Sequence, residues 1–118
     1  MNSDIEKQKT VVYINSENMG AGDDGLGGLL MGTFLSTLED FAREVSHILL
    51  VNAGVKMVCT GSDKLETMQA LADSGIEILS CTTCLNHYRL QDKVGAGSKS
   101  TMFSILEVLT GTDKILTP

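Results

Sequence analysis

Short apolar runs alternate along the chain with longer stretches of helical periodicity. Each run is rich in Val, Ile or Leu and is bounded by polar or glycine-containing residues, which is typical of a strand buried on both faces of a parallel sheet. The main runs cover residues 11–14, 47–51 and 76–79, and a short run at 115–116 predicts an edge strand. The pattern therefore places the strands of one sheet in separate parts of the chain.

The segments between these runs predict helices. Apolar residues recur every three or four positions over residues 25–45. A second helix is expected to begin at a capping box formed by Asp63 and Glu66 and to end at Gly75, which suits a left-handed C′ position. The remaining segments are predicted to be helical at 85–90 and 102–109, extended at 55–58 and a loop at 95–100.

The order of these elements predicts the fold class. Single helices between strands imply right-handed crossovers and a three-layer α/β/α sandwich with a mostly parallel sheet and flavodoxin-like layering. Residues 11–118 are expected to form one domain after a flexible lead-in at 1–10. Sites in such sheets form beyond the carboxyl ends of the strands, so Asn15, Asn52 and Gly54 are candidate binding residues.

Residues 20–25 spell the pattern G-x-G-x-x-G between a strand and a helix. In a dinucleotide site, such a glycine backbone approaches a pyrophosphate. Here Asp23 and Asp24 would place two carboxylates at that position. The preferred interpretation is therefore a helix cap.

Charge and composition restrict the partners and the compartment. With Lys plus Arg 9 against Asp plus Glu 15, the net charge of −6 argues against binding to nucleic acid or to an anionic membrane. No apolar stretch is long enough to span a bilayer, so a soluble, cytoplasmic protein is expected. Three cysteines in a chain with an adequate core favour reduced thiols over a disulfide framework.

The segment Cys81-Thr82-Thr83-Cys84 follows closely on an apolar run. A thiol placed between a strand end and a helix start meets free backbone N–H groups, which favour the thiolate. Because thiolates attack sulfur and bind soft metals, the pair supports persulfide transfer, disulfide exchange or metal ligation. A thioredoxin-like site is disfavoured, since it needs a cis-proline facing the pair and the only proline is Pro118.

Other interpretations of the cysteines stay open. Cys81, Cys84 and His87 are spaced so that a soft metal could take three ligands, and Cys59 is a conceivable fourth. The same strand ends could bind a small anion, with Lys99 drawing an anion or a thiolate toward the site. The pair could also be inert core, and Cys59 by itself is expected to be buried structure.

The segment 76–85 resembles the reactive segment of DsrE-like sulfur-relay proteins. Further segments are similar, in the same order, to the C-terminal domain of YedF-type proteins of selenium metabolism: 12–16, 22–27, 51–56 and 61–62. The resemblance extends over 11–117 and implies a DsrE-like α/β/α fold that commonly forms homo-oligomers. Thr82 stands where the family usually has glycine.

This resemblance also implies a function. Cys81 matches the cysteine that carries a persulfide in sulfur relay, and Cys84 would be the resolving thiol. The chain would then be a sulfurtransferase or sulfur-relay carrier that needs no cofactor and exchanges sulfur or selenium with the thiols of donor and acceptor proteins. YedF-type proteins also contain an N-terminal sulfur-carrier domain without a counterpart here, which is a candidate source of the donor cysteine.

Overall fold

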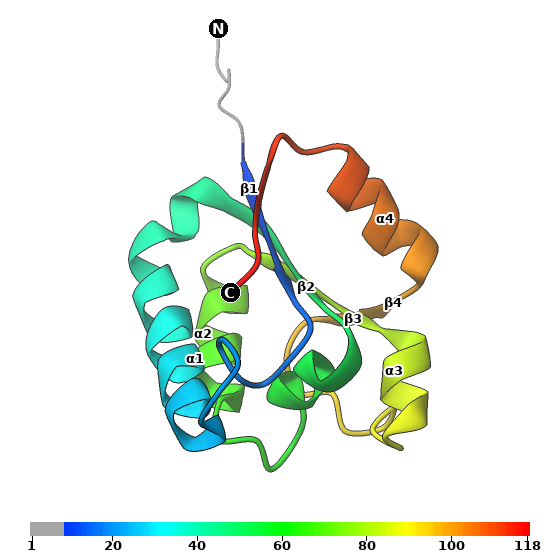
Figure 1. Ribbon diagram of the computed structural model, residues 1–118. Coiled ribbons are helices and arrows are strands. Elements are labelled where there is room, and N and C mark those ends of the chain that lie inside the picture. Colours follow the sequence, from blue (N-terminus) through cyan, green and yellow to red (C-terminus); the bar gives the residue numbers. More distant parts are fainter. Residues whose placement is uncertain (1–8) are drawn as a thin grey trace, which may run out of the picture.

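A parallel sheet forms the centre of the molecule. The computed structural model describes residues 9–118. The strands are β1 Thr10–Ile14, β2 Val45–Leu50, β3 Glu77–Cys81, β4 Ser98–Ser100 and β5 Lys114–Leu116. They form a five-stranded sheet in the order β4-β3-β2-β1-β5, with every neighbouring pair parallel (Figure 1). The predicted lead-in, 1–10, lies outside the described residues except at its end, where Thr10 already belongs to β1.

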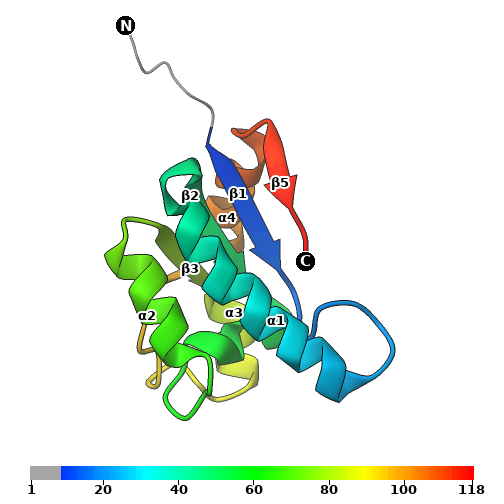
Figure 2. The same ribbon diagram turned by 90° about the vertical axis from the view of Figure 1, so that its left-hand side faces the viewer.

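Helices cover both faces of this sheet. They are α1 Asp24–Leu38, α2 Leu65–Asp73, α3 Thr82–His87 and α4 Met102–Thr110, with two 3₁₀ helices, η1 Glu39–Glu44 and η2 Asn52–Val58. Figures 1 and 2 show α1 and α2 on one side of the sheet and α3 and α4 on the other. The predicted three-layer α/β/α fold with a parallel sheet is confirmed.

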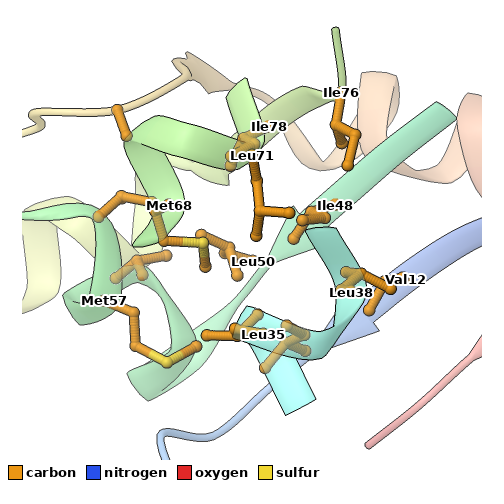
Figure 3. Close-up of a cluster of buried hydrophobic side chains, with 14 of the residues drawn as sticks. Val12, Leu35, Leu38, Ile48, Leu50, Met57, Met68, Leu71, Ile76 and Ile78 are labelled. Carbon is orange, nitrogen blue, oxygen red and sulfur yellow. The ribbon is translucent and has the colours of Figure 1, made fainter. Parts of the chain in front are cut away.

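Side chains of the three central strands, β1, β2 and β3, alternate between two cores, as the two-residue period of a strand requires. On β2, Ile48 faces α1 and α2, whereas Leu49 faces the opposite side together with Ile105 of α4. Figure 3 shows the first core, to which α1 contributes Leu35 and α2 contributes Leu71. Burial on both faces explains why the central strands appear in the sequence as continuous apolar runs.

The first helix is capped as expected but is shorter than predicted. The Asp23 carboxylate accepts a hydrogen bond from the Leu26 N–H at 2.7 Å, which confirms the capping interpretation. The helix ends at Leu38, and Phe41 leaves helical geometry with φ −114° and ψ 15°. The predicted end near Val45 is wrong, because this residue begins β2.

Three other expectations are wrong. Residues 55–58 are not extended but belong to η2. No capping box opens α2: Lys64 precedes the helix without a side-chain cap, and its N–H donates to the Ser62 hydroxyl at 3.1 Å. The predicted loop at 95–100 contains β4, an all-polar edge strand whose composition carries no strand signal.

Candidate thiol site

Two cysteines lie at the carboxyl edge of the sheet, where β3 ends and α3 begins. Cys81 is the last residue of β3 and the N-cap residue of α3, with φ −64° and ψ 121°. The helix begins at Thr82, earlier than the predicted start at residue 85, and the Thr82 hydroxyl donates to the Ser100 carbonyl of β4 at 2.8 Å. Cys84 therefore lies in the first turn of α3, close to Cys81.

The two thiols differ in their access to solvent. Cys81 is 2% exposed and belongs to the core on the α4 side of the sheet. Cys84 is partly exposed, and its Sγ accepts a hydrogen bond from the backbone N–H of Asn52 at 3.0 Å. An incoming reactant can therefore reach Cys84 more readily than Cys81.

Folding raises the pKa of the Cys84 thiol. Burial is the largest cause, and the hydrogen bond and charge of the neighbouring Cys81 raise the pKa further, whereas the Asn52 N–H lowers it. The expectation that the helix start favours the thiolate is therefore wrong for Cys84. A helix of only six residues and a single backbone donor do not offset the loss of solvation.

Asn52 connects the thiol site to two residues that the sequence did not single out. It has a positive φ of 50°, and its side-chain Oδ1 accepts a hydrogen bond from the Tyr88 hydroxyl at 2.8 Å. The Lys56 ammonium lies 4.4 Å from the centroid of the Tyr88 ring. The one available signal was an Asn directly after a strand, because Asn tolerates the left-handed region better than most residues.

The other candidate binding residues have different positions. Gly54 is buried, and a Cβ there would lie 2.6 Å from the Ile14 carbonyl oxygen, so glycine lets η2 lie against the end of β1. Asn15 is exposed directly after β1. Lys99 lies in β4, and its ammonium donates to the Gln91 carbonyl at 3.1 Å. The structure thus directs Lys99 to a loop carbonyl and not to the thiols.

The alternative metal site is not assembled. Within residues 9–118, no three His, Cys, Asp or Glu side chains come together in a way that could hold a metal ion. The exposed His87 ring instead packs edge-on against Tyr88, with 5.0 Å between the ring centroids. Cys59 is buried, as expected, and its thiol donates to the Val55 carbonyl at 3.3 Å. The set of Cys81, Cys84 and His87 therefore does not form a ligand cluster.

None of the helices in the described part of the chain is long and apolar enough to cross a membrane.

Comparison with known proteins identifies the fold. No protein-family model and no curated protein matches the sequence. Similar solved structures include the YchN protein of E. coli, with a TM-score of 0.74 and 16% identity over 95% of this chain and 100% of the other. They also include MTH1491 of Methanobacterium thermoautotrophicum, a protein of unknown function, with a TM-score of 0.68 and 19% identity over 95% of this chain and 100% of the other. BT1422 of Bacteroides thetaiotaomicron, a conserved protein of unknown function, matches with a TM-score of 0.65 and 16% identity over 93% of this chain and 95% of the other. At these identities the likeness concerns the fold alone. This chain shares its α/β/α fold with these three proteins.

Proposed function

We propose that this domain carries sulfur or selenium on the Cys81–Cys84 pair and passes it to the thiol of a partner protein. The observation that carries the proposal is the placement of two free thiols at one point of the carboxyl edge, one partly exposed and one buried. A partly exposed thiol can meet a donor protein, and a buried one can keep a persulfide away from water. The DsrE-like fold, which is associated with sulfur relay, supports this function.

The transfer chemistry balances without an added oxidant. In loading, the Cys84 thiolate attacks the outer sulfur of a donor persulfide; an S–S bond forms at Cys84 and the donor thiolate leaves. The Cys81 thiolate then attacks that outer sulfur, which regenerates the Cys84 thiolate and leaves the persulfide on Cys81, as the family resemblance implies. Delivery repeats this attack with the thiolate of the acceptor protein.

The same pair also allows reductive release. Attack by the Cys84 thiolate on the inner sulfur of a Cys81 persulfide expels hydrosulfide and leaves a Cys81–Cys84 disulfide. An external dithiol must then reduce this disulfide before the next cycle. The two outcomes differ in which sulfur is attacked, and they leave different products on the protein.

The proposal includes a cytoplasmic location, where donor and acceptor thiols are kept reduced. It also includes self-association, for which the exposed apolar residues of α4 provide a surface. These residues are Met102, Phe103 and Leu106.

The test is sulfur loading followed by mass measurement. We would incubate the reduced protein with a cysteine desulfurase and free cysteine and measure the intact mass without reductant. The expected result is a gain of one sulfur atom that dithiothreitol removes. If the protein gains no sulfur while its thiols remain open to alkylation, the carrier function is wrong.

Single substitutions assign the two roles. Cys84→Ser should reduce loading to background, because the buried thiol then has to meet the donor directly. Cys81→Ser should still load, but its persulfide should be lost faster to glutathione. Cys59→Ala removes a thiol away from the site and should behave as wild type. Normal loading of Cys84→Ser would mean that sulfur enters at Cys81 and would overturn the entry role of Cys84.

A further inference from the structure

Asn52 makes two side-by-side contacts with α3 and its C-cap. Its N–H donates to Cys84 Sγ at 3.0 Å and its Oδ1 accepts from the Tyr88 hydroxyl at 2.8 Å. Cys84 and Tyr88 are four positions apart, so they lie on the same side of the helix, one turn from each other. Asn52 therefore links η2 to this segment at two points one helical turn apart.

We propose that Tyr88 is a positioning residue for the thiol site: its hydroxyl holds Asn52 in the left-handed conformation that aims the Asn52 N–H at Cys84 Sγ. This inference deepens the proposed carrier function and rests on it for its biological meaning. Tyr88 itself does not contact the sulfur that would be transferred; it acts through Asn52.

The backbone of Asn52 needs such support. A φ of 50° is uncommon outside glycine, and although Asn tolerates it better than most residues, a contact that holds its side chain favours this conformation over the extended one. Asn52 is also exposed, so burial does not hold it in place. The Tyr88 hydrogen bond is the side-chain contact that fixes this residue within the described part of the chain.

Tyr88 is in turn held from the same 3₁₀ helix. Lys56 belongs to η2, as Asn52 does, and its ammonium lies 4.4 Å from the centroid of the Tyr88 ring. A cation over an aromatic ring is attracted by the negative face of the ring. The hydroxyl and the ring of Tyr88 are thus both tied to η2, and the ring cannot swing away without losing both contacts.

The consequence is a more reactive Cys84. A backbone N–H donor stabilises the thiolate, which is the attacking species, against the burial that disfavours it. The titratable or charged groups on the packed elements are Cys81 of β3, Lys56 and Cys59 of η2 and its C-cap, and His87 and Tyr88 at the end of α3. Tyr13 of β1 packs against the same buried cluster as Cys84. Glu77 lies at the other end of β3, where His47 contacts it at 3.3 Å.

The experiment is the pH profile of Cys84 alkylation by iodoacetamide, followed by peptide mass, in the full-length reduced protein. Tyr88→Phe should shift the profile to higher pH and slow alkylation at pH 8 by about two- to tenfold, the factor that corresponds to one hydrogen bond of ordinary strength. Tyr13→Phe removes the same atom from the other tyrosine, on β1, and should leave the profile in place. A Tyr88→Phe profile identical to that of wild type overturns the proposal.

A double substitution tests the route through Asn52. Asn52→Gly accepts a positive φ but lacks the acceptor for Tyr88. Adding Tyr88→Phe to Asn52→Gly should therefore change the profile no further, whereas a full additional shift would mean that Tyr88 acts by another route and would overturn the proposal. Alkylation needs no sulfur donor, so it tests the positioning role of Tyr88 independently of the loading assay. A failure of the carrier function can therefore be told apart from a failure of this proposal.

Discussion

The two faces of the sheet are built from alternate residues of the same strands but are covered differently. Toward α1 and α2, the strand side chains meet buried side chains of both helices and of η2. Toward α4, the helix contributes Ile105 as its buried residue. Three other apolar residues of α4 are exposed: Met102, Phe103 and Leu106. The helices of the first face, which we call the closed core, bury six residues, four from α1 and two from α2, although α1 also exposes Leu26 and Leu29. Helix α4 buries one residue, and we call its face the thin core.

Because of this difference, the residues that stabilise the fold most and the thiols of the candidate site lie in different parts of the molecule. Apolar burial stabilises the fold by roughly 25 cal/mol per Å², so most of the unfolding free energy should come from the α1–α2 face. Cys81 belongs to the thin core, and Cys84 touches both cores. Segments with few buried contacts open locally at a lower free energy than the whole domain. The thiols thus lie where local opening would give a partner access.

The largest expected effect is the loss of a side chain from the closed face. Leu71→Ala should lower the unfolding free energy by about 2–5 kcal/mol, because it leaves a cavity in the core between α2 and the sheet. Urea denaturation at pH 7 measures it. In protein dilute enough to be monomeric, Leu106→Ala removes the same atoms from a position that is 55% exposed and should change the free energy by less than about 0.5 kcal/mol.

An equal effect of the two substitutions would contradict the comparison. It would mean that the proposed self-association through α4 persists at the protein concentration of the measurement and buries Leu106 against a second copy of the chain. Repeating the Leu106→Ala measurement over a range of protein concentrations would show this, because the stability of an associating protein depends on concentration.

The second effect concerns the contact of η2 with β1. Gly54→Ala would place a Cβ 2.6 Å from the Ile14 carbonyl oxygen, so the backbone must shift at a cost of about 1–3 kcal/mol. Because η2 also carries Asn52, we expect slower alkylation of Cys84 as well. The control is Gly28→Ala within α1, where the nearest atom, of Asn18, is 3.7 Å away. It should stabilise the protein by about 0.5–1 kcal/mol. Unchanged stability of Gly54→Ala would show that η2 is not fixed against β1.

These examples also show what the sequence could predict. The central strands were readable because burial on both faces demands continuous apolar residues. The end of α2 was readable because Gly75 takes a φ of 105°, which other residues rarely adopt. Strand β4 could not be predicted, because its residues are polar and it forms a strand only by pairing with β3. In this pairing, Ser98 of β4 lies beside Leu79 of β3.

The sequence likewise predicted the position of the candidate site but not the contacts within it. The position of Cys81 and Cys84 at a strand end follows from local pattern, and the structure confirms that placement. The environment of Cys84 depends on contacts between residues 32 and 36 positions apart, those of Asn52 with Cys84 and with Tyr88. No local periodicity encodes such contacts. Persulfide formation on Cys81 stays a prediction for the loading assay.

A smaller effect should come from the Ser80 hydroxyl. Ser80 is fully buried, and its Oγ has no hydrogen-bond partner among the described residues. Alternation along β3 places it on the α1–α2 side, next to Ile78 in that row. Since an unpaired buried polar group is destabilising, Ser80→Ala should raise the unfolding free energy by about 1 kcal/mol. Calorimetric melting measures it, and a lower melting temperature would show that the hydroxyl has a partner such as a buried water.

The smallest effect on the unfolding free energy at neutral pH comes from ionisation of the thiols. It can be compared between Cys59 in the closed core and Cys84 at the thiol site. Burial is the largest cause of the raised pKa of both Cys59 and Cys84. The folded state therefore holds these protons more tightly than the unfolded chain. Their contribution to stability is fully present below the pKa of an unfolded thiol, about 8.5, and is lost as pH rises through the folded values.

We therefore expect the urea midpoint to fall between pH 7.5 and pH 9.5 and to fall less in Cys59→Ala, which removes the thiol of the closed core. Cys84→Ala should reduce the fall in the same direction, because its thiol also has a raised pKa. A pH dependence that neither substitution alters would contradict this account and assign the loss of stability to other groups. If Cys84→Ala alone reduces the fall, the proton held by folding belongs to the thiol site and not to the closed core.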